Sequence, residues 1–359
     1  MDNVYIIAEA GVNHNGERKT AFDLIDVALE SGADAIKFQT FKASNLVTKY
    51  AEKAQYQKET TSGDDTQFKM LKELELHYDL HFDLKKYCEL EGIEFLSTAF
   101  DIESLLFLSQ ELNLNKLKIP SGEITNAPLI LEFAKTGKEI ILSTGMSNLQ
   151  EIKNALSLIA CGLIDRNQSL EELSSEILSE AFESKIGKSN LKEHITLLHC
   201  ITEYPTPMDE VNLRSIDLIK EQFKLPTGFS DHTDGYLASL AAVSKGACVI
   251  EKHFTLDKNA VGPDHKASLE PIELKQMIKE IRVIEDMQGK EIKEAMPSEI
   301  KNIPIARKSI VAACDIKEGE LFTTKNLTTK RPGNGISPMK IMDLLGTNAE
   351  RNYREDELI

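Results

Sequence analysis

The chain has 359 residues, enough for one large domain and a small one, and its hydrophobic content of 41% and charged content of 28% are ordinary for a globular protein. Its formal net charge of −16 argues against nucleic acid as a partner and against a basic membrane-binding face. An anionic substrate would therefore need a local basic pocket set against this overall field.

The N-terminal residues lead directly into an apolar strand-like run, without the basic and apolar regions of a signal peptide. No apolar run approaches the roughly 20 residues of a membrane span. The five cysteines are scattered and form no CxxC pair, which is typical of reduced thiols. We therefore expect a cytoplasmic protein with no membrane partner.

Short apolar runs alternate with segments of helical spacing over residues 1–288. In chain order, strands are expected at 4–8, 35–38, 93–96, 116–119, 139–142, 195–198, 226–229 and 247–250. Helices are expected at 19–30, 80–90, 102–112, 129–135, 149–159, 213–223, 237–245 and 272–287. Eight strand–helix units predict a (β/α)8 TIM barrel of the α/β class. A doubly wound sheet is disfavoured because no GxGxxG turn follows the first strand.

Several segments fall outside this alternation. A polar excursion at 42–67 precedes a helix at 68–74, and the acidic, serine-rich stretch 165–189 has the spacing of an inserted surface helix. Residues 289–305 are polar and are expected to be a linker. Strands at 309–313 and 321–324 and a helix at 339–345 predict a small C-terminal domain over 306–359.

Two histidines follow the last two expected strands of the barrel. His232 stands in Ser230-Asp231-His232-Thr233, and His253 stands in Glu251-Lys252-His253-Phe254-Thr255. Because parallel neighbours expose their carboxyl ends on one face, both imidazoles are expected at the same rim. A lone histidine would more simply cap a strand, but two at matched positions favour a divalent-metal site with open positions.

Cations and short hydroxyls recur at the other strand ends. The cations are Lys37, Lys118 and Lys252, and the hydroxyls are Thr98, Ser121, Ser143 and Ser230. Any one of them could be a solvated charge or a cap, but their recurrence suits a phosphate and a carboxylate held together. Glu9, Glu123 and Asp264 add carboxylates that could hold sugar hydroxyls or move protons.

Short motifs containing these residues recur along the whole chain. In chain order they are Glu9–Gly16, Lys37–Thr40, Lys118–Glu123, Ser143–Met146, Tyr204–Pro207, Ser230–Thr233, Glu251–Thr255, Gly262–Asp264 and Lys330–Gly335. In this order they resemble the motifs of the bacterial sialic acid synthases (N-acetylneuraminate synthases), and the similarity runs from end to end, including their C-terminal antifreeze-like (SAF) domain.

The resemblance implies that phosphoenolpyruvate condenses with N-acetylmannosamine and water to give N-acetylneuraminate and phosphate. It implies that His232 and His253 hold Mn²⁺ or Mg²⁺, with Glu9 beside the reacting carbons. Phosphoenolpyruvate would be held by Lys37, Thr98, Lys118, Ser121, Ser143 and Ser230. The sugar would be held by Gln39, Glu123, Tyr204, Asp264 and Arg331, the last from the SAF domain of a second subunit in a domain-swapped homodimer. One departure is Thr202, where some members carry Asn.

Three alternatives stay open. Legionaminic acid synthases run the same chemistry on 2,4-diacetamido-2,4,6-trideoxymannose, and only an assay with both sugars separates them. A metal-dependent aldolase would use pyruvate, which phosphate release from phosphoenolpyruvate would exclude. A catalytically inactive sugar-binding protein is disfavoured by the intact Glu9, Lys118, His232 and His253.

Overall fold

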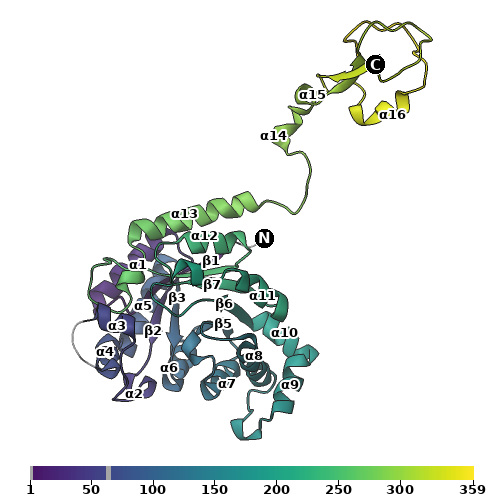
Figure 1. Ribbon diagram of the computed structural model, residues 1–359. Helices are drawn as coiled ribbons and strands as arrows, with labels where there is room; N and C mark the ends of the chain where they lie inside the picture. Colours follow the sequence, from purple (N-terminus) through teal and green to yellow (C-terminus); the bar gives the residue numbers. More distant parts are fainter. Residues whose placement is uncertain (1–2, 62–65) are drawn as a thin grey trace. The chain divides into compact units, whose positions relative to one another are not determined.

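The computed structural model describes residues 3–61 and 66–359 and divides the chain into two compact units, the second of which runs from Lys290 to Ile359. Residues 62–65, within the predicted polar excursion, lie outside the described residues. The elements of the first unit are drawn in Figure 1.

Eight parallel strands close into a barrel in the first unit. Closure comes from β1, which pairs with β2 on one side and with β8 on the other. This confirms the predicted (β/α)8 fold. The strands are β1 (Tyr5–Gly11), β2 (Ala35–Thr40), β3 (Glu94–Ala99), β4 (Lys116–Ile119), β5 (Glu139–Ser143), β6 (Ile195–His199), β7 (Thr227–Asp231) and β8 (Val249–His253).

Helices surround the barrel and bury their apolar faces against it (Figure 1). Local signals set their ends: Asn148 and Glu151 form a reciprocal capping box before α8, and Gly32 ends α1 in the left-handed conformation with φ 85°. The helices are α1 (Arg18–Ser31), α5 (Tyr78–Glu91), α6 (Ile102–Leu106, continued by a π-helical turn to Glu111), α7 (Ala127–Lys135), α8 (Leu149–Ile164), α11 (Arg214–Phe223), α12 (Leu237–Ser244) and α13 (Pro271–Gln288).

The barrel interior is apolar at one level and polar at another. Side chains from several strands, including Ile7, Leu96, Ile141 and Leu198, form a small core of their own. Polar residues occupy the carboxyl-terminal ends of the strands, described below. A packed lower layer under a polar rim is the usual arrangement of this fold.

Three short helices follow β2 and stand together beside its end: α2 (Ala43–Leu46), α3 (Gln55–Thr60) and α4 (Gln67–Leu74) (Figure 1). The backbone N–H of Ala43 donates to Glu75 at 2.7 Å, which ties α2 to the end of α4. The backbone N–H of Gly262 donates to the carbonyl of Thr60 at 3.4 Å, which ties α3 to the loop after β8.

The inserted segment forms two helices where one was predicted. These are α9 (Ser175–Glu183) and α10 (Lys185–His194), and the second runs on directly into β6. Ser184 separates them because its hydroxyl accepts from the N–H of Gly187 and so starts a new helix.

The second unit contains a two-stranded antiparallel sheet, β9 (Ser309–Ala312) with β10 (Leu327–Lys330). The predicted strand at 321–324 is therefore wrong. Asn326 folds back to accept from the N–H of Thr323 at 2.7 Å, which makes a turn of that segment and leaves the strand to the residues after it. The unit also holds α14 (Pro297–Ile300), α15 (Ile303–Ala306) and α16 (Ile341–Leu344), and a core around Ile310, Phe322 and Tyr353. Helix α14 lies within the predicted linker, and α15 spans its end.

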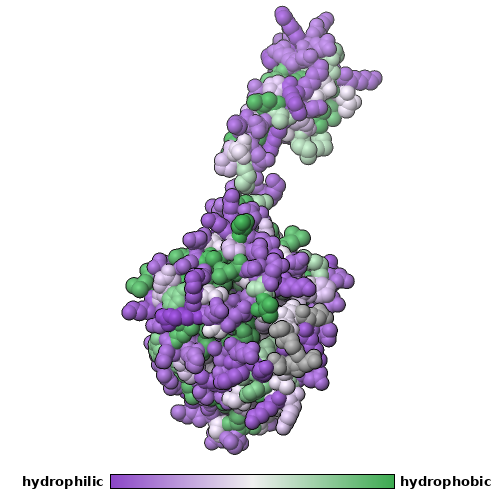
Figure 2. All heavy atoms as spheres, turned by 90° about the vertical axis from the view of Figure 1, so that its left-hand side faces the viewer, coloured by the Kyte–Doolittle hydropathy of each residue, from purple (hydrophilic) through white to green (hydrophobic). Residues whose placement is uncertain are grey.

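On the face of the first unit shown in Figure 2, hydrophobic and hydrophilic side chains are interspersed. Scattered apolar side chains are normal for a protein surface. None of the described helices is long and apolar enough to cross a membrane.

Candidate active site

One cavity of about 360 Å³ is lined by every predicted site residue of the first unit except Lys252. Because parallel barrel strands all end at the same rim, polar residues far apart in sequence meet there. The predicted residues that line it are Glu9, Lys37, Gln39, Thr98, Lys118, Ser121, Glu123, Ser143, Tyr204, Ser230, His232, His253 and Asp264.

Strand register sets these side chains at matching heights. Glu9 pairs in register with Lys37 on one side and with His253 on the other. Thr98 pairs with Lys118, and Ser230 pairs with Glu251. We call the set Glu9, Lys37, Thr98, Lys118, Ser230 and Glu251 the polar floor of the cavity.

Two buried lysines and two buried carboxylates interlock in the polar floor. The Nζ of Lys37 lies 2.6 Å from Oε2 of Glu9 and 3.5 Å from Oε2 of Glu251, and it donates to Thr98 at 2.8 Å. The Nζ of Lys118 lies 3.2 Å from Oε1 of Glu251. All four side chains are almost fully buried, so each charge depends on its oppositely charged neighbours in place of water.

Glu251 was not predicted as a site residue, although it lies at the centre of the polar floor. Besides both lysines, it accepts a hydrogen bond from Ser230 at 2.8 Å. Burial alone would raise the pKa of Glu251, but Lys118 and Lys37 hold it below its ordinary value. Its spacing of two from His253 was the signal available in the sequence, since such positions share one face of a strand.

Glu9 behaves differently from Glu251. Burial raises the pKa of Glu9 to about 7 despite its contact with Lys37. A carboxyl group with that pKa can take up or release a proton near neutral pH.

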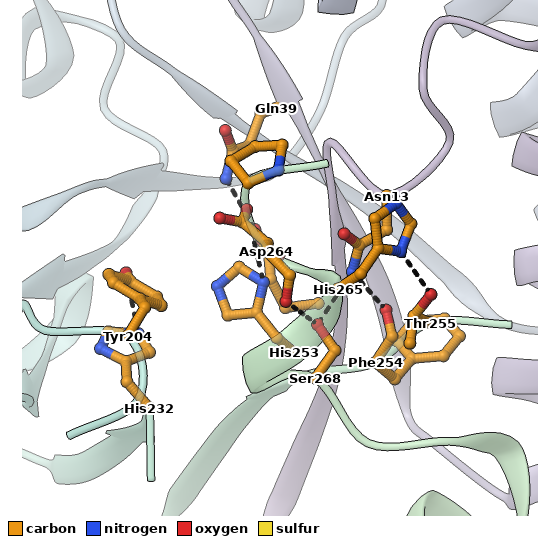
Figure 3. Close-up of polar contacts among 12 residues, drawn as sticks. Asn13, Gln39, Tyr204, His232, His253, Phe254, Thr255, Asp264, His265 and Ser268 are labelled. Atoms are coloured by element: carbon orange, nitrogen blue, oxygen red, sulfur yellow. Dashed lines mark hydrogen bonds and ion pairs between the residues drawn. The ribbon is translucent and has the colours of Figure 1, made fainter. Parts of the chain in front are cut away.

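The two predicted histidines face each other, with ring centroids 5.7 Å apart. The Nδ1 of His232 lies 2.6 Å from the carbonyl of Ile201, so this nitrogen carries the proton, and the lone pair of Nε2 faces the hydroxyls of Tyr204 and Ser230, each at 3.2 Å. Figure 3 shows the ring of Tyr204 over His232. Burial lowers the pKa of His232 to about 4 and holds that of His253 well below its usual value. Both imidazoles are therefore neutral near pH 7.

The loop after β8 holds a carboxylate beside His253. Oδ2 of Asp264 lies 3.9 Å from Nδ1 of His253, and burial raises the pKa of Asp264 to about 6. Asn13 donates to the hydroxyl of Ser268 at 2.9 Å, and Ser268 donates to the carbonyl of Asp264 at 2.6 Å, which fixes this loop (Figure 3).

Gly11 permits the close approach of His253 and Gln39. Its φ is +53°, and a Cβ there would lie 3.2 Å from Cε1 of His253 and 3.3 Å from Nε2 of Gln39. Glycine therefore suits both the backbone and the space at the end of β1.

Two buried hydroxyls at the cavity have no hydrogen-bond partner in the part of the chain that the structure describes: those of Ser143 and Thr202. Ser121, by contrast, contacts Cys200 and accepts from the N–H of Gly145. Buried hydroxyls are normally hydrogen-bonded, so the two unpaired ones are suited to donate to a bound anion. Sequence reasoning gave Thr202 no binding role.

Lys252 does not belong to the cation set expected at the rim. It is wholly buried on the outer side of β8, where it pairs with Asp231 at 3.2 Å and donates to the carbonyl of Thr233 at 2.6 Å. The strand runs on to His253, so the alternation that turns Glu251 and His253 inward turns Lys252 away from the cavity.

Replacing Asp231 by Asn is expected to destabilise the chain by about 3 kcal/mol or more, because the charge of Lys252 is left buried without a counter-ion. Urea unfolding measures this loss. The matched variant is Asp217→Asn, which removes an exposed ion pair with Lys245 and should change stability far less. Equal effects of the two variants would contradict the structural role of Asp231.

Arg331 lies in the second unit, exposed directly after β10. Its contact with the sugar and the domain-swapped homodimer both stay predictions.

The histidine pair fits a divalent cation. The Nδ1 of His253 is buried without a hydrogen-bond partner among the described residues, and His232 presents the lone pair of Nε2. Neutral imidazoles are common metal ligands. Within residues 3–61 and 66–359, no group of three or more His, Cys, Asp and Glu side chains is arranged to hold a metal, so protein ligands alone would leave coordination positions open.

The closed parallel barrel with a polar cavity at its carboxyl-terminal rim defines a (β/α)8 enzyme. Residues 24–293 match the NeuB family, and residues 307–359 match the SAF domain. The chain belongs to the NeuB family. It is a phosphoenolpyruvate-dependent transferase that forms a carbon–carbon bond, as predicted, and this argues against an inactive sugar-binding protein.

Relatives match over nearly the whole chain. The N,N'-diacetyllegionaminic acid synthase of Campylobacter jejuni is 52% identical over 100% of this chain and 99% of its own. The enzyme of the same name from Legionella pneumophila is 42% identical over 97% and 91%. The crystal structure of an N-acetylneuraminic acid (sialic acid) synthetase from Leptospira borgpetersenii matches with a TM-score of 0.67 and 30% identity, over 84% of this chain and 90% of that one.

Proposed function

We propose that the chain condenses phosphoenolpyruvate with 2,4-diacetamido-2,4,6-trideoxymannose and water to give N,N'-diacetyllegionaminic acid and phosphate. The observation that carries this proposal is the 52% identity, over the full length of both chains, to a synthase named for that product. The sialic acid synthetase from Leptospira is 30% identical. The relatives thus favour the alternative sugar over N-acetylmannosamine, the sugar first implied by the resemblance.

The polar floor binds phosphoenolpyruvate. The phosphate and carboxylate oxygens of phosphoenolpyruvate accept hydrogen bonds from the Nζ groups of Lys37 and Lys118. Before phosphoenolpyruvate binds, Glu9 and Glu251 hold these two lysines in place. The unpaired hydroxyls of Ser143 and Thr202 add donors, as do Thr98, Ser121 and Ser230. Lys37, Lys118, Thr98, Ser143 and Ser230 are buried, so these donors stabilise the charge that builds up on the departing phosphate.

The sugar lies above this floor against Gln39, Glu123, Tyr204 and Asp264, all of which line the cavity. C3 of phosphoenolpyruvate bonds to the aldehyde carbon of the open-chain sugar, C2 becomes electron-poor, water adds there, and the bond from C2 to the phosphate group breaks. Glu9, with a pKa of about 7, is placed to accept or return the proton of the added water.

His232 and His253 would hold Mn²⁺ or Mg²⁺. Such a cation supplies Lewis acidity to an aldehyde oxygen. The carbonyl of Ile201 orients the ring of His232 from behind, which keeps Nε2 free of its proton and aimed into the cavity.

Phosphate release with each sugar alone tests the function. We expect kcat/KM for 2,4-diacetamido-2,4,6-trideoxymannose to exceed that for N-acetylmannosamine by about ten-fold or more, the scale that contacts to a few added groups provide. Pyruvate in place of phosphoenolpyruvate should give no product with either sugar. A higher kcat/KM for N-acetylmannosamine would contradict the proposed substrate, and condensation with pyruvate would indicate an aldolase.

A further inference from the structure

The cavity has an apolar side that sequence reasoning did not use. Val12, Phe41, Met70 and Leu74 form a buried apolar cluster separate from the main core. Six apolar residues that line the cavity on this side are called the apolar wall: Phe41, Leu46, Val47, Met70, Leu71 and Phe100.

The apolar wall lies above the polar floor along two neighbouring strands. Lys37, Gln39 and Phe41 occupy alternate positions along β2 and its continuation, and all three line the cavity. At about 3.3 Å per residue, four residues of strand span roughly 13 Å from floor to wall. β3 repeats the change, because Thr98 bonds Lys37 and Phe100 packs edge-on against Phe41, with centroids 6.0 Å apart.

Two amides are set into the same side of the cavity. Gln57 and Gln67 both line it, and Nε2 of Gln67 donates to Oε1 of Gln57 at 3.3 Å. Oε1 of Gln57 also accepts from the N–H of Ala54 at 2.9 Å, which fixes its orientation. An amide on the ligand would find hydrogen-bond partners here within otherwise apolar surroundings.

We infer that the apolar wall and the Gln57–Gln67 pair select the sugar: the wall takes the C6 methyl group, and the amide pair takes the C4 acetamido group. This inference rests on the proposed function. The aldehyde end must reach the polar floor and the histidine pair for C3 of phosphoenolpyruvate to attack it. The C4–C6 end then points away from the floor, towards the wall.

The same geometry disfavours N-acetylmannosamine. Its C6 hydroxyl would leave water for a surface made of Phe41, Leu71 and their neighbours, and a hydroxyl buried without a partner is unfavourable. Its C4 hydroxyl is too short to reach as far as an acetamido group. The wall therefore acts on the sugar and should leave phosphoenolpyruvate binding unaffected.

Three sugars separate the two contacts. N-acetylmannosamine and 2-acetamido-2,6-dideoxymannose differ at C6, and the latter differs from 2,4-diacetamido-2,4,6-trideoxymannose at C4. We expect Leu71→Asn, at a half-buried position, to lower the preference for the 6-deoxy sugar over N-acetylmannosamine by about ten-fold. Gln67→Leu should lower the preference for the 4-acetamido sugar over its 4-hydroxy analogue by a similar factor.

Matched variants control for general damage to the fold. Leu178→Asn in α9 changes an equally half-buried leucine outside the cavity, and Gln168→Leu changes a half-buried glutamine that contacts Ser169 and Glu172. Neither should alter sugar preference. KM for phosphoenolpyruvate and the thermal midpoint should stay close to wild type in the cavity variants, since the positions are only partly buried.

The outcomes keep this inference apart from the proposed function. Wild-type preference for N-acetylmannosamine would overturn the proposed function itself. The wild type could prefer the diacetamido sugar while Leu71→Asn and Gln67→Leu each change kcat/KM for all three sugars by the same factor. That result would overturn only the role of the apolar wall and the amide pair. Unchanged preferences in both variants would overturn it as well.

Discussion

Removing either imidazole, as His232→Ala or His253→Ala, is expected to lower the rate of phosphate release by about 10³-fold or more. Both rings are buried and neutral, and their centroids are 5.7 Å apart, so one cation can contact both. A loss of several kcal/mol of charge stabilisation corresponds to that factor, at about 1.4 kcal/mol for each ten-fold. Phosphate release at saturating substrates measures the rate, and equilibrium dialysis measures Mn²⁺ binding.

His199→Ala is the matched control for these variants. His199 also ends a barrel strand and is also buried, but its Nε2 contacts the carbonyl of Val211 and it does not line the cavity. This variant should keep its Mn²⁺ binding. Unchanged Mn²⁺ affinity and unchanged turnover in both His232→Ala and His253→Ala would refute a shared cation.

Replacing Lys118 by Met is expected to lower kcat/KM for phosphoenolpyruvate by about 10² to 10³-fold, the usual effect of removing one preorganised donor to developing charge. Lys118 is buried and pairs with Glu251, so its loss also leaves that carboxylate with less positive charge to hold it. Burial lowers the pKa of Lys118, and the carboxylate of Glu251 opposes that shift. Initial rates at varied phosphoenolpyruvate measure the change.

Lys116→Met distinguishes this effect from a general loss of positive charge. Lys116 lies two residues earlier on β4, contacts Glu94 and does not line the cavity. Its replacement should leave kcat/KM for phosphoenolpyruvate within about two-fold of wild type, as expected for a partly exposed pair. Similar losses in both lysine variants would show that the cavity does not hold the anion through Lys118.

The placement of the candidate site followed from sequence because a parallel barrel leaves little freedom. Once the strands are found, polar residues at their carboxyl-terminal ends must share one rim. Lys37, Lys118 and the two histidines were therefore predicted to meet before any contact between them was known. Errors of a few residues in strand ends did not change the predicted meeting of these four residues.

Contacts that depend on register or on side-chain facing were not predictable in the same way. Lys252 was expected at the rim because β8 was predicted to end at residue 250, whereas it continues to His253 and turns Lys252 outward. The pairing of Glu251 with Lys37 and Lys118 depends on how β8 aligns across the barrel, which hydrophobic patterning does not specify. The apolar wall was not predicted, because its residues in α2 and α4 are distant in sequence from the other residues that line the cavity.

We propose that this chain makes a diacetamido nonulosonate from phosphoenolpyruvate. A competition reaction tests it most directly, with equal concentrations of 2,4-diacetamido-2,4,6-trideoxymannose and N-acetylmannosamine, limiting phosphoenolpyruvate and added Mn²⁺, followed by mass analysis of the products. We expect N,N'-diacetyllegionaminic acid to predominate, with one phosphate released per molecule formed. Predominance of N-acetylneuraminate, or product formed without phosphate release, would contradict the account.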